Sequence, residues 1–188
     1  MAYQGLNTPY IAPLDVDAGT YSGGMKCGKL VSTNISPQYK EGSLAADDDS
    51  QAEYDKKLSY ATVDLETDTL PIEVGKLMFG YEVGTGSGDE KDEVVFGDTD
   101  APHYVGYGFI VGQTIHGVRS HVAKVLHKCL FTLGEESYTT SGDDIKFTGS
   151  KISGRASRDK NGKWKTEKVF STHAEADVYL KKKLNITE

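Results

Sequence analysis

The sequence predicts a single, mainly β (α+β) domain over residues 1–188, with two short helices. Residues 60–66 alternate between apolar and polar side chains, which is the period of a strand with one buried face. Asn161-Gly162, between two candidate strands, is a strong signal for a tight hairpin turn. The 21 glycines and 11 tyrosines also favour a β-rich fold, because glycine supplies turns and tyrosine suits half-buried pleated surfaces.

In the first third of the chain, strands are expected at residues 9–14 and 28–35, joined by a connection over residues 15–24. A longer connection is expected over residues 37–55. Long loops inside a compact domain are usually functional or mobile, so this segment has the strongest claim to a function. It carries aromatic, apolar and acidic side chains together: Tyr39, Leu44, Asp47, Asp48, Asp49 and Tyr54.

Two segments predict helices. Residues 70–80 place an apolar stripe at helical spacing, with proline near the start and Gly80 at the end, where each is best tolerated. The stripe consists of Leu70, Val74, Leu77 and Met78. The second helix is expected from Thr172 to about Leu184, because Thr172-His-Ala-Glu175 is a capping-box pattern. Its apolar line consists of Ala176, Leu180 and Leu184, and three lysines near its end suit the helix dipole.

The remaining segments read as strands and their connections. Residues 84–92 are a glycine-rich, acidic connection, and residues 112–117 are expected to connect strands at residues 104–111 and 118–131. On the second of these strands, alternation places four side chains on one face: Val125, His127, Cys129 and Phe131. A further strand is expected at residues 145–156, followed by a turn over residues 158–163 and a returning strand around Trp164.

Composition and charge narrow the function. The 28 acidic and 21 basic residues give a formal charge of −7, which argues against a protein built to hold nucleic acid. The two cysteines, Cys27 and Cys129, form no CxxC pair, and two reduced thiols are the simpler interpretation than a disulfide. The start of the sequence does not resemble a signal peptide, and no apolar run approaches the ~20 residues of a membrane span, so a soluble chain made in a cytoplasm is expected.

Each candidate chemical site in the sequence has a simpler interpretation. His121, His127 and Cys129 could ligate zinc, but residues six apart on a strand are ~20 Å apart and cannot converge. A metal site would need Cys27 or His173 to fold over the His127–Cys129 pair, and a half-buried strand face is the simpler interpretation. A Cys129–histidine nucleophile would require tertiary contacts that the sequence does not show. The glycine-rich run at residues 84–88 lacks a following helix that could aim N–H groups at phosphate. Asp47-Asp48-Asp49 lacks the rhythm of a calcium loop. Neither an enzyme nor a cofactor is therefore expected.

An ordered set of motifs resembles one known family. The segment beginning Ile35-Ser-Pro has an Ala46-Asp47-Asp48 core and leads into the strand at residues 58–66. Residues 69–80 are similar to that family's "Leu-Pro-(apolar)-Glu" helix, residues 101–109 to its "Ala-Pro-Tyr-Val-Ala-x-Gly-Phe" strand, and residues 147–164 to its long strand with Gly-Lys-Trp in the returning hairpin. Together these motifs resemble the major tail protein (tail tube protein) family of long-tailed, siphovirus-type bacteriophages of Gram-positive hosts, over about residues 9–170. Residues 84–93 and 112–124 depart from the family's pattern.

The resemblance implies a tail-tube-type β-sandwich with a flanking short helix and a long inter-ring loop. Six copies would close into a ring, and rings would stack into the tube that delivers DNA to the host. The implied partners are further copies of the chain, the tape measure protein and the tail terminator and tail tip proteins, with DNA passing without specific binding and no membrane partner. The implied location is the virion tail, assembled in the host cytoplasm.

By analogy with such tubes, residues 37–55 would form the ring-to-ring contact, with Tyr39, Leu44 and Tyr54 docking while Asp47, Asp48 and Asp49 set the register. An acidic bore would repel the DNA phosphates, a hypothesis compatible with the charge of −7. The competing class is a non-catalytic β-sandwich that recognises a host surface sugar or protein, for which the 11 tyrosines could supply stacking surfaces. A third class, a metal-dependent hydrolase, would require bound metal.

Overall fold

The computed structural model describes residues 2–46, 49–85, 91–136 and 149–186, and within them the chain is mainly β, as the sequence predicts. The strands are β1 (Ala2–Asp15), β2 (Thr20–Tyr21), β3 (Met25–Lys26), β4 (Leu30–Ala46), β5 (Asp49–Thr67), β6 (Glu82–Val83), β7 (Val94–Val95), β8 (Val105–Ile115), β9 (Val118–Leu133), β10 (Ser150–Ser157) and β11 (Lys165–Phe170). The helices are α1 (Ile72–Phe79) and α2 (His173–Lys183). Neither of these helices is long and apolar enough to cross a membrane.

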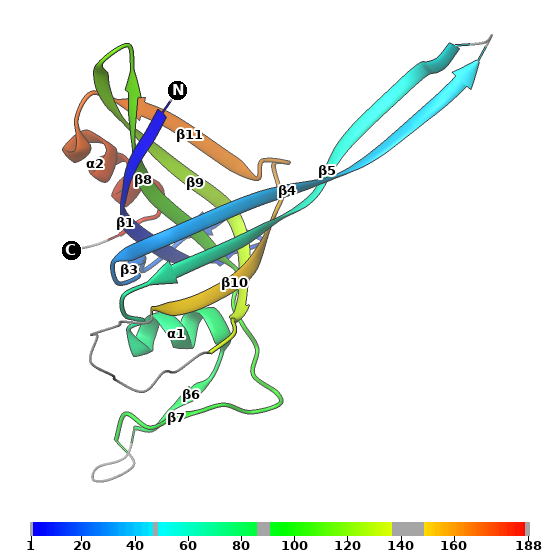
Figure 1. The fold of residues 1–188 in the computed structure, drawn as a ribbon. Coiled ribbons are helices and arrows are strands. Elements are labelled where there is room, and N and C mark those ends of the chain that lie inside the picture. Colours follow the sequence, from blue (N-terminus) through cyan, green and yellow to red (C-terminus); the bar gives the residue numbers. More distant parts are fainter. Residues whose placement is uncertain (1, 47–48, 86–90, 137–148, 187–188) are drawn as a thin grey trace, which may run out of the picture.

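Most strands belong to one antiparallel sheet with the order β2-β1-β8-β9-β10-β5-β4, to which β3 adds beside β1 and β11 beside β9. The long strand β9 is shared by two parts of this sheet. Its first half pairs with β11, from His121 to Leu126, and its second half pairs with β10, from Lys128 to Leu133. In Figure 1, β4, β5 and β10 lie in front of β1, β8 and β9, so the sheet folds over on itself into two layers.

A β-bulge in β9 sits where the two parts diverge. Val105 pairs with Cys129 and Tyr107 pairs with Leu126, so β9 spans three residues while β8 spans two. The extra residue reverses the alternation of side chains. Val125 therefore packs beneath α2, whereas Cys129 and Phe131 belong to the other core cluster. The prediction that Val125, His127, Cys129 and Phe131 share one face was wrong, because a sequence period of two does not reveal a bulge.

The main core fills the space between the two layers and beneath α1. Tyr107 and Phe109 from β8 lie against Phe131 from β9, with the Tyr107 and Phe131 rings edge-on at 5.9 Å. From the opposite layer, β5 contributes the predicted alternating set of Ala61, Val63 and Leu65, all buried. Cys27 and Cys129 both belong to this core as free thiols.

Helix α1 covers one end of this core. It begins after Pro71 and ends at Gly80, whose φ of 80° is the left-handed conformation that glycine adopts most easily. Val74 and Met78 are fully buried, and Leu70 and Leu77 pack against the core from partly exposed positions. The predicted helix and its apolar stripe are therefore confirmed.

Helix α2 covers a second, smaller core on the outer face of β8 and β9. The capping box is present, since Thr172 Oγ1 accepts from the Glu175 N–H and the Glu175 carboxylate accepts from the Thr172 N–H. The buried residues Ala176, Leu180 and Leu184 form the apolar line expected from the sequence. This helix is confirmed to within one residue at either end.

The connections and strands of the second half of the chain agree with the prediction only in part. Strand β8 continues to Ile115 and β9 begins at Val118, so the turn is only His116-Gly117, both with positive φ, and not residues 112–117. The turn at Asp159–Lys163 is confirmed, with hydrogen bonds joining these two residues and Gly162 at a φ of 76°. The strand that follows it, β11, pairs with β9 and not with β10. Of the strand expected at residues 145–156, the structure describes the part from Ser150 onward.

Candidate assembly surfaces

The β4–β5 hairpin extends beyond the body of the molecule as a two-stranded projection (Figure 1). Its pairing continues through Tyr39↔Leu58 and Gly42↔Asp55 to Ala46↔Asp49. We call residues 40–46 and 49–57 the arm; at about 3.3 Å per residue it projects by roughly 20–25 Å. Ser59 is an extra residue on β5 at the base of the arm, and such a bulge bends and twists a hairpin.

The prediction that residues 37–55 form a loop was therefore wrong. Most of this segment is strand, and its two halves pair with each other or with the residues that follow. All the described side chains of the arm are exposed: Lys40, Glu41, Ser43, Asp55, Lys56 and Lys57. Its sequence carries no apolar alternation by which a strand could be recognised.

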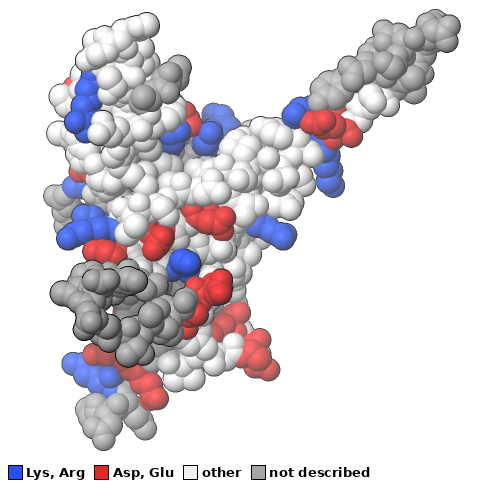
Figure 2. Space-filling view, in the orientation of Figure 1, with Lys and Arg blue, Asp and Glu red and all other residues white. Residues whose placement is uncertain are grey.

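Charged contacts lie near the base of the arm, one between its two strands and one within β5. Lys56 Nζ lies 2.6 Å from Glu41 Oε1 and 4.5 Å from the centre of the Tyr39 ring. Lys57 Nζ lies 2.8 Å from Asp55 Oδ2, and this contact lowers the pKa of the Asp55 carboxyl. Figure 2 shows these acidic and basic residues side by side where the arm leaves the body. The contacts are exposed, so each contributes little to stability.

The structure places four of the six predicted contact residues, Tyr39, Leu44, Asp49 and Tyr54, along this projection. Tyr39 lies at the base of the arm and is 46% exposed. Leu44, Asp49 and Tyr54 belong to the outer part of the hairpin, where Leu44 pairs with Glu53 and Ser43 with Tyr54. Asp47 and Asp48 lie outside the described residues. The suspected site is thus a protruding hairpin, and its described members share one projection.

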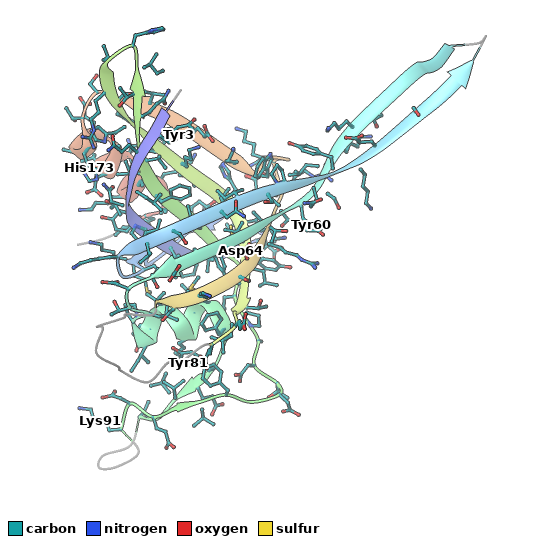
Figure 3. The ribbon with its side chains drawn as sticks, viewed as in Figure 1. Tyr3, Tyr60, Asp64, Tyr81, Lys91 and His173 are labelled. Carbon is teal, nitrogen blue, oxygen red and sulfur yellow. The ribbon has the colours of Figure 1, made fainter. Side chains whose placement is uncertain are left out.

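A polar face covers the outer side of β4, β5, β10 and the end of β9. One row of this face crosses all four strands through paired residues: Asn34, Asp64, Ser153 and Thr132. Ser153 Oγ donates to Asp64 Oδ1 at 2.8 Å, which ties β10 to β5 (Figure 3). This face was not predicted as a site, although the outward positions of Thr62, Asp64 and Glu66 were visible in the alternation.

The charges on this polar face are mixed. Asp64 and Glu66 project from β5, Lys151 and Arg155 project from the neighbouring β10, and Lys128 projects from β9. The Arg155 guanidinium lies over the Tyr60 ring at 4.8 Å, so it rests against the sheet. The face is therefore hydrophilic and close to neutral.

The outer edge of β4 is the longest strand edge that carries no partner among the described strands, where β4 pairs with β5 alone. An edge of this kind presents unpaired N–H and C=O groups that can add to a strand of another chain. The edge is continuous with the arm. The two features together form one extended surface available to a partner.

His127 and Cys129 do not form a shared site. Their side chains point to opposite sides of the sheet because of the bulge. His127 Nε2 lies 2.7 Å from Thr166 Oγ1, and Nδ1 lies 3.5 Å from Asp159 Oδ2. The pKa of His127 is lowered, chiefly by burial, against the raising effect of Asp159.

His121 instead meets His173, with ring centres 5.7 Å apart and planes nearly perpendicular. His173 Nε2 also lies 2.8 Å from Asn7 Oδ1, which connects the start of α2 to β1. Across the described residues, no group of three or more His, Cys, Asp or Glu side chains is placed to hold a metal ion. The acidic run that was weighed as a calcium site lies partly outside those residues.

Both thiols are free and fully buried, Cys27 beside β1 and Cys129 on β9. Burial raises the pKa of Cys27 to about 12 and raises the pKa of Cys129 further. Because the thiolate is the reactive form, neither thiol is poised as a nucleophile. No histidine is recorded as a hydrogen-bond partner of either thiol in the described part of the chain.

Comparison of the sequence with models of protein families and with curated protein sequences finds no match.

Proposed function

We propose that this chain is a structural subunit that assembles with copies of itself into the tail tube of a long-tailed bacteriophage. The ordered motifs described above, from Ile35-Ser-Pro to the Gly-Lys-Trp hairpin, carry the family resemblance. The observation that carries the proposal in the structure is the arm together with the free outer edge of β4. A projecting hairpin of roughly 20–25 Å whose described side chains are exposed contributes little to the stability of its own chain and is suited to contact another.

In this proposal six copies form a ring, and the arm reaches from one ring to the next. Strand edges of neighbouring copies meet within the ring, which removes the liability of the unpaired edge of β4. The tape measure protein would occupy the bore during assembly, and tail terminator and tail tip proteins would cap the two ends. The chain would act in the virion tail and perform no catalysis.

We assign the polar face of β4, β5 and β10 to the wall of the bore. Its hydroxyl, amide and mixed charged groups suit contact with water and passing DNA. A wall dominated by lysine and arginine would hold phosphates through counterion release. With Asp64 and Glu66 set against Lys128, Lys151 and Arg155, the assigned wall is nearly neutral, which refines the hypothesis of an acidic bore.

The sugar-binding alternative receives little support from the exposed tyrosines. Tyr3 lies on β1, Tyr39 on β4 and Tyr104 just before β8, so they do not share one platform. Each of these rings also lies beneath a lysine ammonium group, at 4.3–4.9 Å. A stacking site for sugars needs free aromatic faces close together.

The proposal is tested by electron microscopy of the purified chain and of an armless variant. In that variant Asn-Gly replaces residues 40–57, because Tyr39 pairs with Leu58 and a two-residue turn fits between them. The full chain should form rings or tubes with a central hole, alone or on addition of a tail assembly initiator. The armless variant should keep its circular dichroism spectrum and melting cooperativity but lose tubes. A full chain that stays monomeric with the initiator, or an armless chain that forms normal tubes, would contradict the proposal.

A further inference from the structure

The turn between β8 and β9 carries an exposed apolar pair. Ile115 and Val118 face each other across the two-residue turn His116-Gly117, and Val118 is 69% exposed. Arg119, also exposed, follows directly. We call Ile115, Val118 and Arg119 the knob. No carboxylate among the described residues forms an ion pair with Arg119.

A pocket of about 190 Å³ lies at the other end of the body, between α1, the β6–β7 hairpin and the ends of β9 and β10. Its apolar lining includes Tyr81, Phe96, Leu133 and Ile152, and the Tyr81 and Phe96 rings meet edge-on at 5.0 Å. Leu133 and Phe96 remain substantially exposed. An apolar pocket with exposed walls is the usual form of a site that receives an apolar group.

The knob cannot reach the pocket of its own chain. Val118 is the first residue of β9 and Leu133 is the last, so one strand joins the two features. At about 3.3 Å per residue, a straight strand of this length would separate them by roughly 50 Å, and the bulge in β9 makes the distance somewhat shorter. Figure 3 shows the separation through Tyr3, near the knob end, and Tyr81, at the pocket end.

The charges of the two features are complementary. Glu135 and Glu136 stand exposed at the pocket, and neither forms an ion pair with any residue that the structure describes. Lys151 also lines the pocket, so the acids exceed the bases by one there. Arg119 points to the face opposite to Val118, where its guanidinium lies over Gly112. The complementarity is therefore between the knob end of the molecule, which carries this cation, and the pocket end, which carries the glutamates.

We propose that the knob of one copy inserts into the pocket of the next copy, end to end. The contact joins two different surfaces, so it does not close on itself in a dimer and propagates from copy to copy. This inference rests on the proposed tube, because it names the surfaces by which rings stack. In Figure 1 the knob and the arm point toward the same end of the molecule, opposite to α1 and β6, so both would contact the same neighbouring ring.

Two side chains do not make a complete interface, since specific interfaces bury roughly 1,600 Å² in total. The knob therefore acts together with the arm. Burial of the knob in the pocket would fix how one copy is positioned on the next, as buried anchor residues do at other interfaces.

Cross-linking tests the contact directly. A chain carrying both Val118→Cys and Leu133→Cys should give a ladder of covalent oligomers on oxidation or with a short bismaleimide. Each single variant should give dimers at most, since Cα atoms ~50 Å apart cannot be bridged within one chain. The native thiols do not interfere because both are buried. The matched control places the first cysteine at Val178, a 65% exposed valine on α2, instead of at Val118. A chain carrying Val178→Cys and Leu133→Cys should give no ladder.

A second measurement compares Val118→Asp with Val178→Asp, which introduce the same charge at two exposed valines. Only Val118→Asp should raise the concentration needed for assembly, by roughly tenfold or more. The contact is overturned if the wild-type chain forms tubes while the double-cysteine chain gives no ladder, or if Val118→Asp assembles like Val178→Asp. In that case the proposed tube still stands. A ladder without tubes supports the contact between copies and contradicts the closed ring. If neither a ladder nor tubes form, the contact and the proposed tube are both contradicted.

Discussion

Among the described residues, His127 is the most deeply buried titratable group outside the core clusters, at 5% exposure. Asp159 faces Nδ1, which assigns the proton to that atom and leaves Nε2 to accept the Thr166 hydroxyl. The ring thereby joins the bulge of β9 to β11 and to the turn before it. Lys163 and Lys183 lie near enough to disfavour a second proton on the ring.

This arrangement predicts a loss of stability in acid. Burial lowers the pKa of His127 in the folded chain below its ordinary value of 6.5, so the unfolded chain takes up the proton first as the pH falls. The stability that neutral His127 contributes is present above pH 6.5 and is lost as the pH falls through the lower folded-state pKa. The slope from this single group is at most about 1.4 kcal/mol per pH unit.

Urea denaturation between pH 7.5 and 5 checks this prediction with two variants. His127→Gln retains a hydrogen-bonding side chain for Thr166 but cannot be protonated, so its profile should be flatter than that of the wild-type chain. His103→Gln, at an exposed position, should retain the wild-type slope. His121 has a lowered pKa as well, so the difference between variants is the informative quantity. Equal slopes for the wild-type chain and His127→Gln would contradict the assignment.

At Gly75, in α1, we expect replacement by alanine to destabilise the chain, although the same replacement usually stabilises a helix. Replacing glycine by alanine in a helix usually stabilises it by about 1 kcal/mol. A Cβ at Gly75 would instead overlap with the Tyr81 hydroxyl, which donates to the Ile72 carbonyl at 2.8 Å. We expect Gly75→Ala to lower the free energy of unfolding by about 1–3 kcal/mol, as overpacking does.

The test is a double-mutant cycle with Tyr81→Phe, which removes the overlapping oxygen. Gly75→Ala should cost less in the Tyr81→Phe background than in the wild-type chain, because the ring edge can shift more easily than a hydrogen-bonded hydroxyl. If Gly75→Ala is neutral or stabilising in the wild-type chain, the packing at this position is not as described.

At the scale of elements, the capping box determines how firmly α2 covers the second core. Thr172→Ala removes the acceptor for the Glu175 N–H and should lower the free energy of unfolding by about 1 kcal/mol. Ser171→Ala, one residue earlier and exposed, is the matched control and should have almost no effect. Chemical denaturation followed by circular dichroism measures both. Similar losses for the two variants would show that the cap contributes nothing specific.

The sequence predicted those helices and strands whose own residues carry a local pattern, such as a cap or an alternation of apolar and polar side chains. Both helices follow from local chemistry, namely Gly80 at the end of α1 and the Thr172–Glu175 box at the start of α2. The buried half of β5 follows from its alternation, because one face meets the core and the other meets solvent. These signals depend on residues close together in the chain.

Features set by distant pairing were not predictable. The bulge in β9 exists because β8 and β10 fix its register from two sides, and no residue type marks it. The arm is strand because its two halves pair with each other, although its sequence lacks any apolar period. The polar face could be found strand by strand, but its rows across β4, β5, β10 and β9 emerge only from the sheet order.

For the whole molecule, the length of β9 sets the distance between the knob at one end and the pocket at the other. The first residue of β9 lies in the knob and its last residue lines the pocket. In the proposed stack, equivalent points in successive copies are therefore about one length of this strand apart. The strand length of roughly 50 Å is therefore the upper limit of the distance between equivalent points in stacked copies.

That limit predicts the axial repeat of the tube. Strands of a closed barrel tilt by about 35–45° from its axis, so a strand of roughly 50 Å advances roughly 35–40 Å along the axis. Cryo-electron microscopy of assembled tubes should give a ring-to-ring spacing in this range. The Val118→Asp chain, if driven into tubes at high concentration, should keep that spacing, because the arm contacts the same neighbouring ring. A wild-type spacing above roughly 50 Å would leave the knob short of the pocket, and stacking would then have to depend on the arm alone.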